Sequence, residues 1–317
     1  MSVDYLRVSV TDRCNLRCVY CNPLGKCDFV ERKEILTFEE IHRLVRLFVE
    51  CGIRRIRLTG GEPLVRKNII DLVRQLATIS GIEELSLTTN GVLLEPMAAE
   101  LKDAGLNRVN ISLNSADGDC YRQITGFDFL SNVIAGMYKA IEVGLTPVKI
   151  NSVIIKDINV FQIPKLVKMS VHLPVLVRFI EYCPTGKYTK SSSYYVPNRK
   201  VREIIERGFG PLSSIVVGNG NGPALYFKVK GSTGAIGFIS GMSSIFCRWC
   251  NRLRLTSDGK VKPCLYSTRC YDLKKLVRSG APDQAVLGLI GRILREKSSY
   301  TRLNSSVNNF SMQKIGG

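Results

Sequence analysis

The segment Cys14-Asn15-Leu16-Arg17-Cys18-Val19-Tyr20-Cys21 decides how the rest of the sequence is interpreted. Its three cysteines have C-x3-C-x2-C spacing and follow an apolar run at residues 6–10 that suits a buried strand. Cysteine thiolates hold iron–sulfur clusters, and a four-iron cluster normally takes four of them. Three sulfurs on one short loop therefore predict a cluster with one open iron, by the logic that separates catalytic metal sites from closed structural ones.

Two alternatives stay open for these cysteines, namely three unpaired core residues and half of a zinc site. The aromatic Tyr20 before the third cysteine and Asn22 after it complete a pattern that resembles the radical S-adenosylmethionine (SAM) superfamily. That resemblance implies that the amino and carboxylate groups of SAM chelate the open iron.

The composition indicates a folded protein with metal or redox chemistry. Of the 317 residues, 45% are hydrophobic, which is enough for a sizeable core. We find no 18-residue apolar run and no signal peptide, so we expect a cytoplasmic protein with no membrane partner. In that compartment, eleven cysteines point to metal binding or redox function before disulfides.

Positive charge is in excess, with 45 Lys and Arg residues against 27 Asp and Glu residues. The resulting formal net charge of +18 favours polyanionic partners, such as nucleotides, nucleic acids or anionic lipids, without selecting one of them. No run of five consecutive basic residues occurs, so we expect most of these side chains on solvated helix faces.

Up to about residue 205 the hydrophobic pattern alternates between buried strands and amphipathic helices. Six strand–helix units predict a parallel α/β fold of the incomplete (β/α)6 TIM-type barrel class. In such barrels the site lies at the carboxyl ends of the strands, and we expect every motif described below to lie there. The expected strands are residues 6–10, 54–58, 84–88, 108–113, Val148–Ile154 and 176–181. The expected helices are residues 37–51, 68–79, 96–104, 130–143 and 161–170, with a capping box at Thr37 and a cap at Asn159.

The sequence changes character after a helix at residues 198–207. We place a domain boundary there, between a partial barrel at residues 1–208 and a smaller C-terminal α+β domain at residues 209–317. This second domain is expected to carry a second iron–sulfur cluster. Its expected elements are strand-like segments at 224–229 and 235–239 and helices at 271–278 and 282–295.

The segment Thr59-Gly60-Gly61-Glu62-Pro63 follows the second expected strand. Two glycines allow a backbone to approach a ligand closely, and Pro63 fixes the exit turn. Glu62 and exposed carbonyl groups could accept hydrogen bonds from a ligand ammonium group. A simple loop is the alternative. Together with the first cysteine segment, however, it resembles the part of radical SAM enzymes that binds the amino group of SAM.

A second cysteine cluster has C-x2-C-x13-C spacing and consists of Cys247, Cys250 and Cys264. Three sulfurs without an evident fourth ligand favour another iron–sulfur cluster, with an open iron that faces the substrate. A zinc ribbon is the alternative, with Cys270 as the fourth ligand. Arg252 and Arg254 would face the same side of a strand, where two guanidinium groups suit a phosphate or a nucleobase.

With the second cluster, the resemblance narrows to the GTP 3′,8-cyclase family of molybdenum cofactor biosynthesis and covers nearly the whole chain. Besides both cysteine clusters and the Gly-Gly-Glu-Pro segment, the matching stretches are residues 9–14, 87–91, 178–181, 257–260 and the terminal Gly316-Gly317. The resemblance implies two [4Fe-4S] clusters and SAM as cofactors. It also implies a 5′-deoxyadenosyl radical that takes hydrogen from ribose C3′ of GTP, after which the carbon radical attacks guanine C8.

The resemblance assigns roles to individual positions. The cluster ligands are Cys14, Cys18, Cys21, Cys247, Cys250 and Cys264. The SAM contacts are Tyr20, Gly61, Glu62, Ser112 and Cys183, and the GTP contacts are Arg7, Arg57, Thr88, Lys156, Arg252 and Arg254. Gly316 and Gly317 would reach into the active site, because residues without side chains can enter a crowded pocket. Asn114 and Cys183 depart from the family, in which aspartate and methionine are usual.

The partners implied by the resemblance are GTP, an electron donor of the flavodoxin or ferredoxin type, and a cyclic pyranopterin monophosphate synthase that receives the product. No nucleic acid partner is implied, and a homodimer is left open. One alternative is a radical SAM enzyme that matures peptides or modifies RNA with an auxiliary cluster. Another is a non-catalytic zinc protein that binds nucleic acid. Arg252, Arg254 and the terminal glycines favour GTP.

Overall fold

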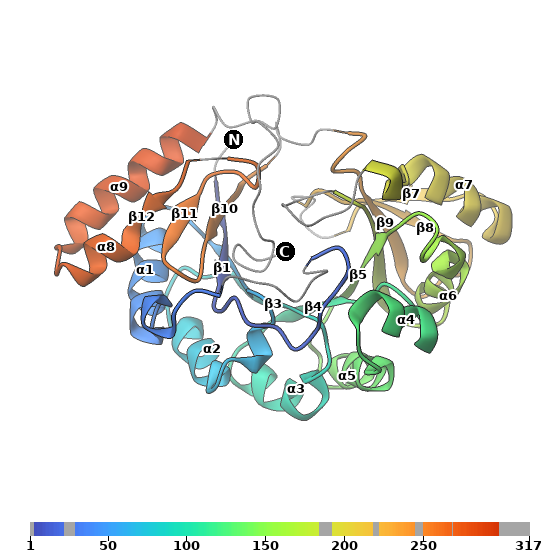
Figure 1. Ribbon diagram of the computed structural model, residues 1–317, viewed down its shortest axis with the longest axis horizontal. Helices are drawn as coiled ribbons and strands as arrows, with labels where there is room; N and C mark the ends of the chain where they lie inside the picture. The colour runs from blue at the N-terminus through green and yellow to red at the C-terminus, as the bar shows by residue number, and fades with distance from the viewer. Residues whose placement is uncertain are drawn as a thin grey trace.

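A computed structural model describes residues 3–21, 29–183, 192–217, 222–244, 250–267 and 269–297. Its twelve-stranded sheet curves into an open barrel that carries helices on its outer side (Figure 1). Three predicted site residues, Cys247, Gly316 and Gly317, lie outside the described residues. No helix in the described ranges is long and apolar enough to cross a lipid bilayer.

Six parallel strands follow one another in sequence order, which confirms the predicted incomplete (β/α)6 barrel. These strands are β1 (Tyr5–Ser9), β2 (Arg55–Thr59), β3 (Glu84–Thr89), β4 (Arg108–Ser112), β5 (Val148–Ile154) and β6 (Val175–Glu181). The helices between and after them are α1 (Phe38–Glu50), α2 (Ile69–Ala77), α3 (Leu94–Asp103), α4 (Gly118–Thr125), α5 (Leu130–Glu142), α6 (Ile163–His172) and α7 (Asn198–Phe209).

The strands have two chemically different faces. Along β1, Leu6 and Val8 are fully buried in the hydrophobic core that the sheet shares with the helices. Arg7 lies between them in sequence and therefore projects to the other face of the sheet, into the barrel. The barrel interior is thus lined by polar side chains while the outer face supplies the core.

Of the two helix caps predicted from the sequence, one acts as expected. The predicted capping box of α1 is confirmed, since Thr37 Oγ1 accepts from Glu40 N at 3.2 Å and the Glu40 carboxylate accepts from Thr37 N at 2.8 Å. Asn159 does stand at the N-cap position of the short 3-10 turn Val160–Gln162 that leads into α6. Its side chain makes no capping bond, however, and instead bonds near the ends of β4 and β5.

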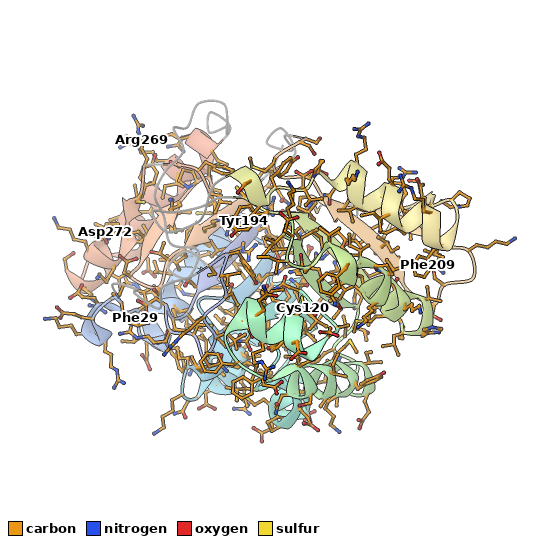
Figure 2. The ribbon with its side chains drawn as sticks, turned by 45° about the vertical axis from the view of Figure 1, so that its right-hand side comes forward. Phe29, Cys120, Tyr194, Phe209, Arg269 and Asp272 are labelled. Carbon is orange, nitrogen blue, oxygen red and sulfur yellow. The ribbon has the colours of Figure 1, made fainter. Side chains whose placement is uncertain are left out.

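The C-terminal part of the chain adds strands to both edges of the barrel sheet. One edge gains β10 (Arg252–Leu255), parallel to β1, followed by the antiparallel β11 (Lys260–Lys262) and β12 (Tyr271–Asp272). The other edge gains β9 (Ala235–Ile239), parallel to β6, followed by the antiparallel β8 (Leu225–Lys228) and β7 (Ser213–Ile215). Phe209, at the end of α7, and Asp272, in β12, accordingly lie on opposite sides of the molecule (Figure 2).

Two C-terminal helices, α8 (Leu273–Arg278) and α9 (Asp283–Glu296), lie beside α1 (Figure 1). Arg43 in α1 donates to the Asp283 carboxylate at 2.8 Å, and Arg278 donates to the Glu40 carboxylate at 2.7 Å. These ion pairs and the parallel pairing of β1 with β10 fasten the end of the chain to its beginning.

Candidate active site in the barrel

The first cysteine segment leaves the carboxyl end of β1 and is held against α4. Arg17 N donates to Thr125 O and Val19 N donates to Ile124 O, both at 2.9 Å. Helix α4 ends directly afterwards at Gly126, whose φ of 82° is left-handed and favours glycine. Backbone hydrogen bonds therefore fix the loop that carries the three cysteines.

The Gly-Gly-Glu-Pro segment holds the same loop from the other side. Gly61 N donates to Thr11 O and Glu62 N donates to Arg13 O, both at 2.7 Å. A Cβ atom at Gly60 would overlap the backbone of Thr11, and one at Gly61 would overlap the carbonyl group of Arg13. The close approach that these glycines allow is thus to the cysteine loop, whereas the sequence led us to expect approach to a ligand.

Glu62 is almost fully buried, and its carboxylate is engaged by the protein. It accepts from Leu64 N at 3.0 Å, from Thr89 Oγ1 at 2.7 Å and from Asn90 N at 2.6 Å. Burial raises the pKa of Glu62 to about 7, although the three donors oppose that shift. Glu62 therefore ties the end of β2 to the end of β3.

The environment of the first cysteines fits an iron–sulfur cluster. Cys14 Sγ accepts from Leu16 N at 3.4 Å and from Asn90 Nδ2 at 3.9 Å. Burial raises the pKa of Cys14 to about 11, and burial together with the nearby Cys14 raises the pKa of Cys18 to about 12. Binding to iron replaces the thiol proton, and N–H groups aimed at the sulfur then stabilise the thiolate.

A closed site for one metal ion is not seen, since no three Cys, His, Asp or Glu side chains in the described ranges are placed to bind one ion. In a four-iron cluster each thiolate binds a different iron, so the cysteines need not converge in that way.

Positively charged side chains lie close to the second cysteine cluster. Burial alone would raise the pKa of Cys250, but Arg252 and Lys297 together lower it to about 7. Lys297 is 5% exposed and its Nζ lies 3.7 Å from Cys250 Sγ. Cys264 and Cys250 both interact electrostatically with Arg254. This donor set also fits a thiolate-bound cluster, with cations that stabilise the negative sulfurs.

The two cysteine clusters lie at opposite ends of the barrel strands, so the prediction that every motif lies at the carboxyl ends is wrong. Cys14 follows the carboxyl end of β1. Cys250 precedes β10, which runs parallel to β1 with Arg252 beside Tyr5, the first residue of β1. Cys264 follows the antiparallel β11 and returns to that same amino end. A five-residue strand such as β1 is about 17 Å long.

Between these ends, three guanidinium groups share one level of the barrel. The register places Arg7 beside Arg57 on β2 and beside Arg254 on β10. Burial lowers the pKa of Arg57 and that of Arg254 to about 10. The pKa of Arg7 is lowered further by burial and by repulsion from Arg254 and Arg57. Parallel pairing thus forces like charges together in a buried space.

Further cations that the sequence analysis missed complete this interior. Lys149 on β5 lies near the positive charges of Arg108, Arg178 and Arg57. Burial, together with repulsion from these three charges, lowers the pKa of Lys149 to about 6. Strand alternation could have revealed Lys149, because it shares the face opposite to the buried Val148 and Ile150. Glu84 is the acidic neighbour of these groups, and it accepts from Arg108 at 2.6 Å.

Several buried polar atoms of this interior have no hydrogen-bond partner among the described residues. They are Tyr5 Oη, Arg7 Nε, Asn151 Oδ1 and Arg178 Nε. A buried polar group without a partner is costly, and a polar ligand removes that cost. Tyr5 Oη, Arg7 Nε and Arg178 Nε are donors, so the interior can satisfy them with an anionic ligand.

The remaining predicted residues fall into two groups. Thr88, Ser112 and Arg252 lie on the barrel strands with the cations described above. Cys183 follows the carboxyl end of β6, and its Sγ lies 3.1 Å from Tyr266 Oη. Lys156 is not brought together with them. It is exposed on the loop after β5 and borders an outer hollow of about 740 Å³ with Phe161 and Lys200.

Two family models match the chain, the radical SAM superfamily at residues 8–169 and a molybdenum cofactor synthesis C-terminal model at residues 175–303. The GTP 3′,8-cyclase of Desulforamulus reducens is 42% identical over 100% of this chain and 98% of its own length. The GTP 3′,8-cyclase of Moorella thermoacetica is 44% identical over 99% of this chain and 98% of its own length. That of Petrotoga mobilis is 47% identical over 84% of this chain and 82% of its own length.

Solved structures with the same fold are more distant in sequence. Streptococcus suis SuiB bound to S-adenosylmethionine has a TM-score of 0.62 at 16% identity, over 92% of this chain and 68% of SuiB. Methylornithine synthase (PylB) has a TM-score of 0.52 at 16% identity, over 66% of this chain and 63% of the synthase chain. At these identities the likeness concerns the fold alone.

Proposed function

Because the chain belongs to the GTP 3′,8-cyclase family of the radical SAM superfamily, we propose that it converts GTP to 3′,8-cyclo-7,8-dihydro-GTP, the first step of molybdenum cofactor biosynthesis. One observation carries the proposal. The barrel interior is cationic, and it lies between two cysteine clusters at opposite strand ends. A nucleoside triphosphate is a polyanion of the kind that such an interior attracts.

The cofactors are two [4Fe-4S] clusters and SAM. Cys14, Cys18 and Cys21 would hold the first cluster, and Cys247, Cys250 and Cys264 the second. The first cluster, when bound, supplies the electron that cleaves SAM to a 5′-deoxyadenosyl radical. The chain itself fixes the cysteine loop through the backbone bonds of Gly61 and Glu62.

For SAM, we propose contacts from the ends of β2, β4 and β6, all at the end of the barrel where the first cysteine loop lies. The residues are Tyr20, Gly61, Glu62, Ser112 and Cys183. Since the Glu62 carboxylate is occupied by three protein donors, its part would be to hold the turn that carries Gly61.

For GTP, we propose that Arg7, Arg57 and Lys149 bind the triphosphate, while Arg252 and Arg254 act near the second cluster. Thr88, on the inner face of β3, supplies a hydroxyl group to the same interior. Lys149 takes the place of Lys156, because only Lys149 lies among the barrel cations. Charge-assisted hydrogen bonds from several guanidinium groups fix both the position and the charge of a triphosphate.

Six further expectations belong to the same proposal. Gly316 and Gly317 would take part in catalysis from the end of the chain, and the chain would divide into domains at residues 1–208 and 209–317. The electron donor would be of the flavodoxin or ferredoxin type, and the product would pass to a cyclic pyranopterin monophosphate synthase. A cytoplasmic location and an assembly of one or two copies complete the expectation.

The test is anaerobic reconstitution with iron and sulfide, followed by incubation with SAM and reductant and with GTP, ATP, a peptide or RNA in separate reactions. We expect about eight irons per chain, as two four-iron clusters require, and 5′-deoxyadenosine that forms only with GTP. Turnover with RNA or peptide and not GTP would instead identify an RNA-modifying or peptide-maturing enzyme. A colourless protein with bound zinc would contradict both.

A further inference from the structure

Asn114, on the loop after β4, is held in one orientation. Its Oδ1 accepts from Val153 N at 2.8 Å, and a backbone N–H can only donate. The amide NH2 group must therefore point the other way, where Asn114 Nδ2 donates to Tyr20 Oη at 2.9 Å. The assignment of oxygen and nitrogen follows from this network, because a flipped amide would place two donors against each other.

A second asparagine makes this arrangement rigid. Asn159 is fully buried, and its Nδ2 donates to Asn114 O and to Val153 O, both at 2.9 Å. Its Oδ1 accepts from Ile155 N at 2.7 Å. These bonds tie the backbone of the loop after β4 to the end of β5. They fix the position from which the Asn114 side chain makes its own bonds to Val153 N and Tyr20 Oη.

The orientation of Asn114 decides where the Tyr20 proton goes. A phenol hydroxyl carries one proton, and Asn114 approaches its oxygen as a donor. The proton of Tyr20 is therefore free for its second partner, the Cys18 side chain, with which the hydroxyl also forms a hydrogen bond. When Cys18 binds iron its sulfur is a thiolate, which accepts and cannot donate. The bond must then run from Tyr20 to Cys18.

We propose that Asn114 is a positioning residue that, through Tyr20, directs a hydrogen bond at the Cys18 sulfur and so raises the reduction potential of the cluster bound by the first cysteines. Hydrogen bonds to cluster sulfurs are a main means by which a protein tunes this potential. The inference rests on the proposed function, since it requires that this cluster is present.

Replacement of Asn114 by aspartate reverses the direction of the hydrogen bonds without changing the shape of the side chain. One carboxylate oxygen keeps the hydrogen bond from Val153 N, and the other accepts a hydrogen bond from the Tyr20 hydroxyl group. The Cys18 sulfur then loses its donor, and a negative charge is added nearby. Both changes disfavour the reduced cluster.

The experiment is a potentiometric titration of the full-length reconstituted protein, followed by electron paramagnetic resonance. Cys264→Ala is included in every sample so that the signal comes from the first cluster. We expect Asn114→Asp to lower the midpoint potential by about 59 mV or more, which is a tenfold loss in a one-electron reduction equilibrium. Tyr20→Phe should lower it too, because the donor is removed.

The double variant Asn114→Asp/Tyr20→Phe tests the route. When Tyr20 has no hydroxyl group, Asn114→Asp should lower the midpoint potential clearly less than it does in the protein that keeps Tyr20. Fully additive shifts in midpoint potential would mean that the aspartate acts through its charge only, and they would overturn the positioning role. A shift below about 59 mV in Asn114→Asp, the value for a tenfold change in a one-electron equilibrium, would overturn it as well. Asn132→Asp, on the exposed face of α5, adds the same charge elsewhere and should change nothing.

Iron and sulfide analysis of the same samples, and of Cys14→Ala in the same Cys264→Ala background, separates two kinds of failure. If Cys14→Ala leaves the iron content of the protein unchanged, no cluster is bound at the first cysteines and the proposed function fails. If the cluster is bound and the midpoint is the same in Asn114→Asp as in the parent, only the role of Asn114 fails.

Discussion

Arg7 and Arg254 are register partners on neighbouring parallel strands, although they come from opposite ends of the chain. Arg57 flanks Arg7 on its other side, so three guanidinium groups share one buried level of the barrel. This arrangement is unfavourable in the empty protein, because burial and mutual repulsion both oppose the charges. It is suited to a ligand that brings several negative charges of its own.

The row of arginines predicts opposite effects on stability and on binding. Arg7→Met should raise the melting temperature of the empty protein, since it removes a repelling buried charge. It should weaken GTP binding roughly tenfold to 100-fold, as expected for the loss of a charge-assisted hydrogen bond of about 1.5–3 kcal/mol. Thermal scanning and anaerobic titration calorimetry measure the two effects. Arg74→Met, on the exposed face of α2, should change neither, and equal GTP affinity in both variants would contradict the assignment of Arg7.

Lys149 predicts proton uptake on binding. Because its pKa is about 6 in the empty barrel, Lys149 is mostly neutral at pH 7, and a bound triphosphate should raise that pKa and draw in a proton. GTP affinity should then fall as the pH rises above about 6, by up to about tenfold per pH unit. Calorimetry at pH 7 in buffers of different ionisation enthalpy counts the proton. Lys149→Met should remove this uptake, while Lys156→Met should keep it. The reverse result would restore Lys156 to the site.

Gly61 predicts a link between the turn after β2 and cluster assembly. Gly61→Ala forces a methyl group against the carbonyl of Arg13 and should destabilise the fold by roughly 1–3 kcal/mol, the usual cost of overpacking. It should also displace the cysteine loop and lower iron incorporation. Gly118→Ala, where nothing lies within 4 Å of the new Cβ, is the matched control. Urea unfolding and iron analysis give the readouts, and normal values for Gly61→Ala would show that the turn can shift freely.

Lys297 predicts a reactive thiol at the second cysteine cluster. In metal-free protein the pKa of Cys250 is about 7, so about half of this thiol is ionised at neutral pH. Lys297→Met removes one of the cations that lower this pKa and should slow alkylation of Cys250 by iodoacetamide several-fold at pH 7. Peptide mapping by mass spectrometry follows the rate. Lys275→Met, in α8, should leave the rate unchanged, and an unchanged rate in Lys297→Met would show that Arg252 alone acts on the thiol.

Much of the barrel could be predicted because apolar residues recur at alternate positions over segments of the length expected for strands. The predicted strand at Val148–Ile154 has the observed bounds, and the capping box at Thr37 starts α1 as expected. Helix α4 was missed, since its sequence GDCYRQIT is short and has few apolar residues, although Asp117 caps its first turn.

The position of the second cysteine cluster could not be predicted from local sequence. Arg252 and Arg254 were correctly placed on one face of a strand, but the edge and direction of that strand depend on its pairing with β1. Parallel pairing places Cys250 at the amino end of the barrel, and no residue near Cys250 encodes that choice. For Lys149 the signal was present, and a stricter use of strand alternation would have found it.

The central claim is that GTP lies in the cationic barrel with its ribose within reach of a radical formed at the first cysteine loop. The most direct measurement uses GTP deuterated at ribose C3′ with reconstituted protein, SAM and reductant, followed by mass spectrometry of the nucleoside product. We predict 5′-deoxyadenosine that carries one deuterium and forms only when GTP is present. Unlabelled 5′-deoxyadenosine, formed equally without GTP, would contradict this account.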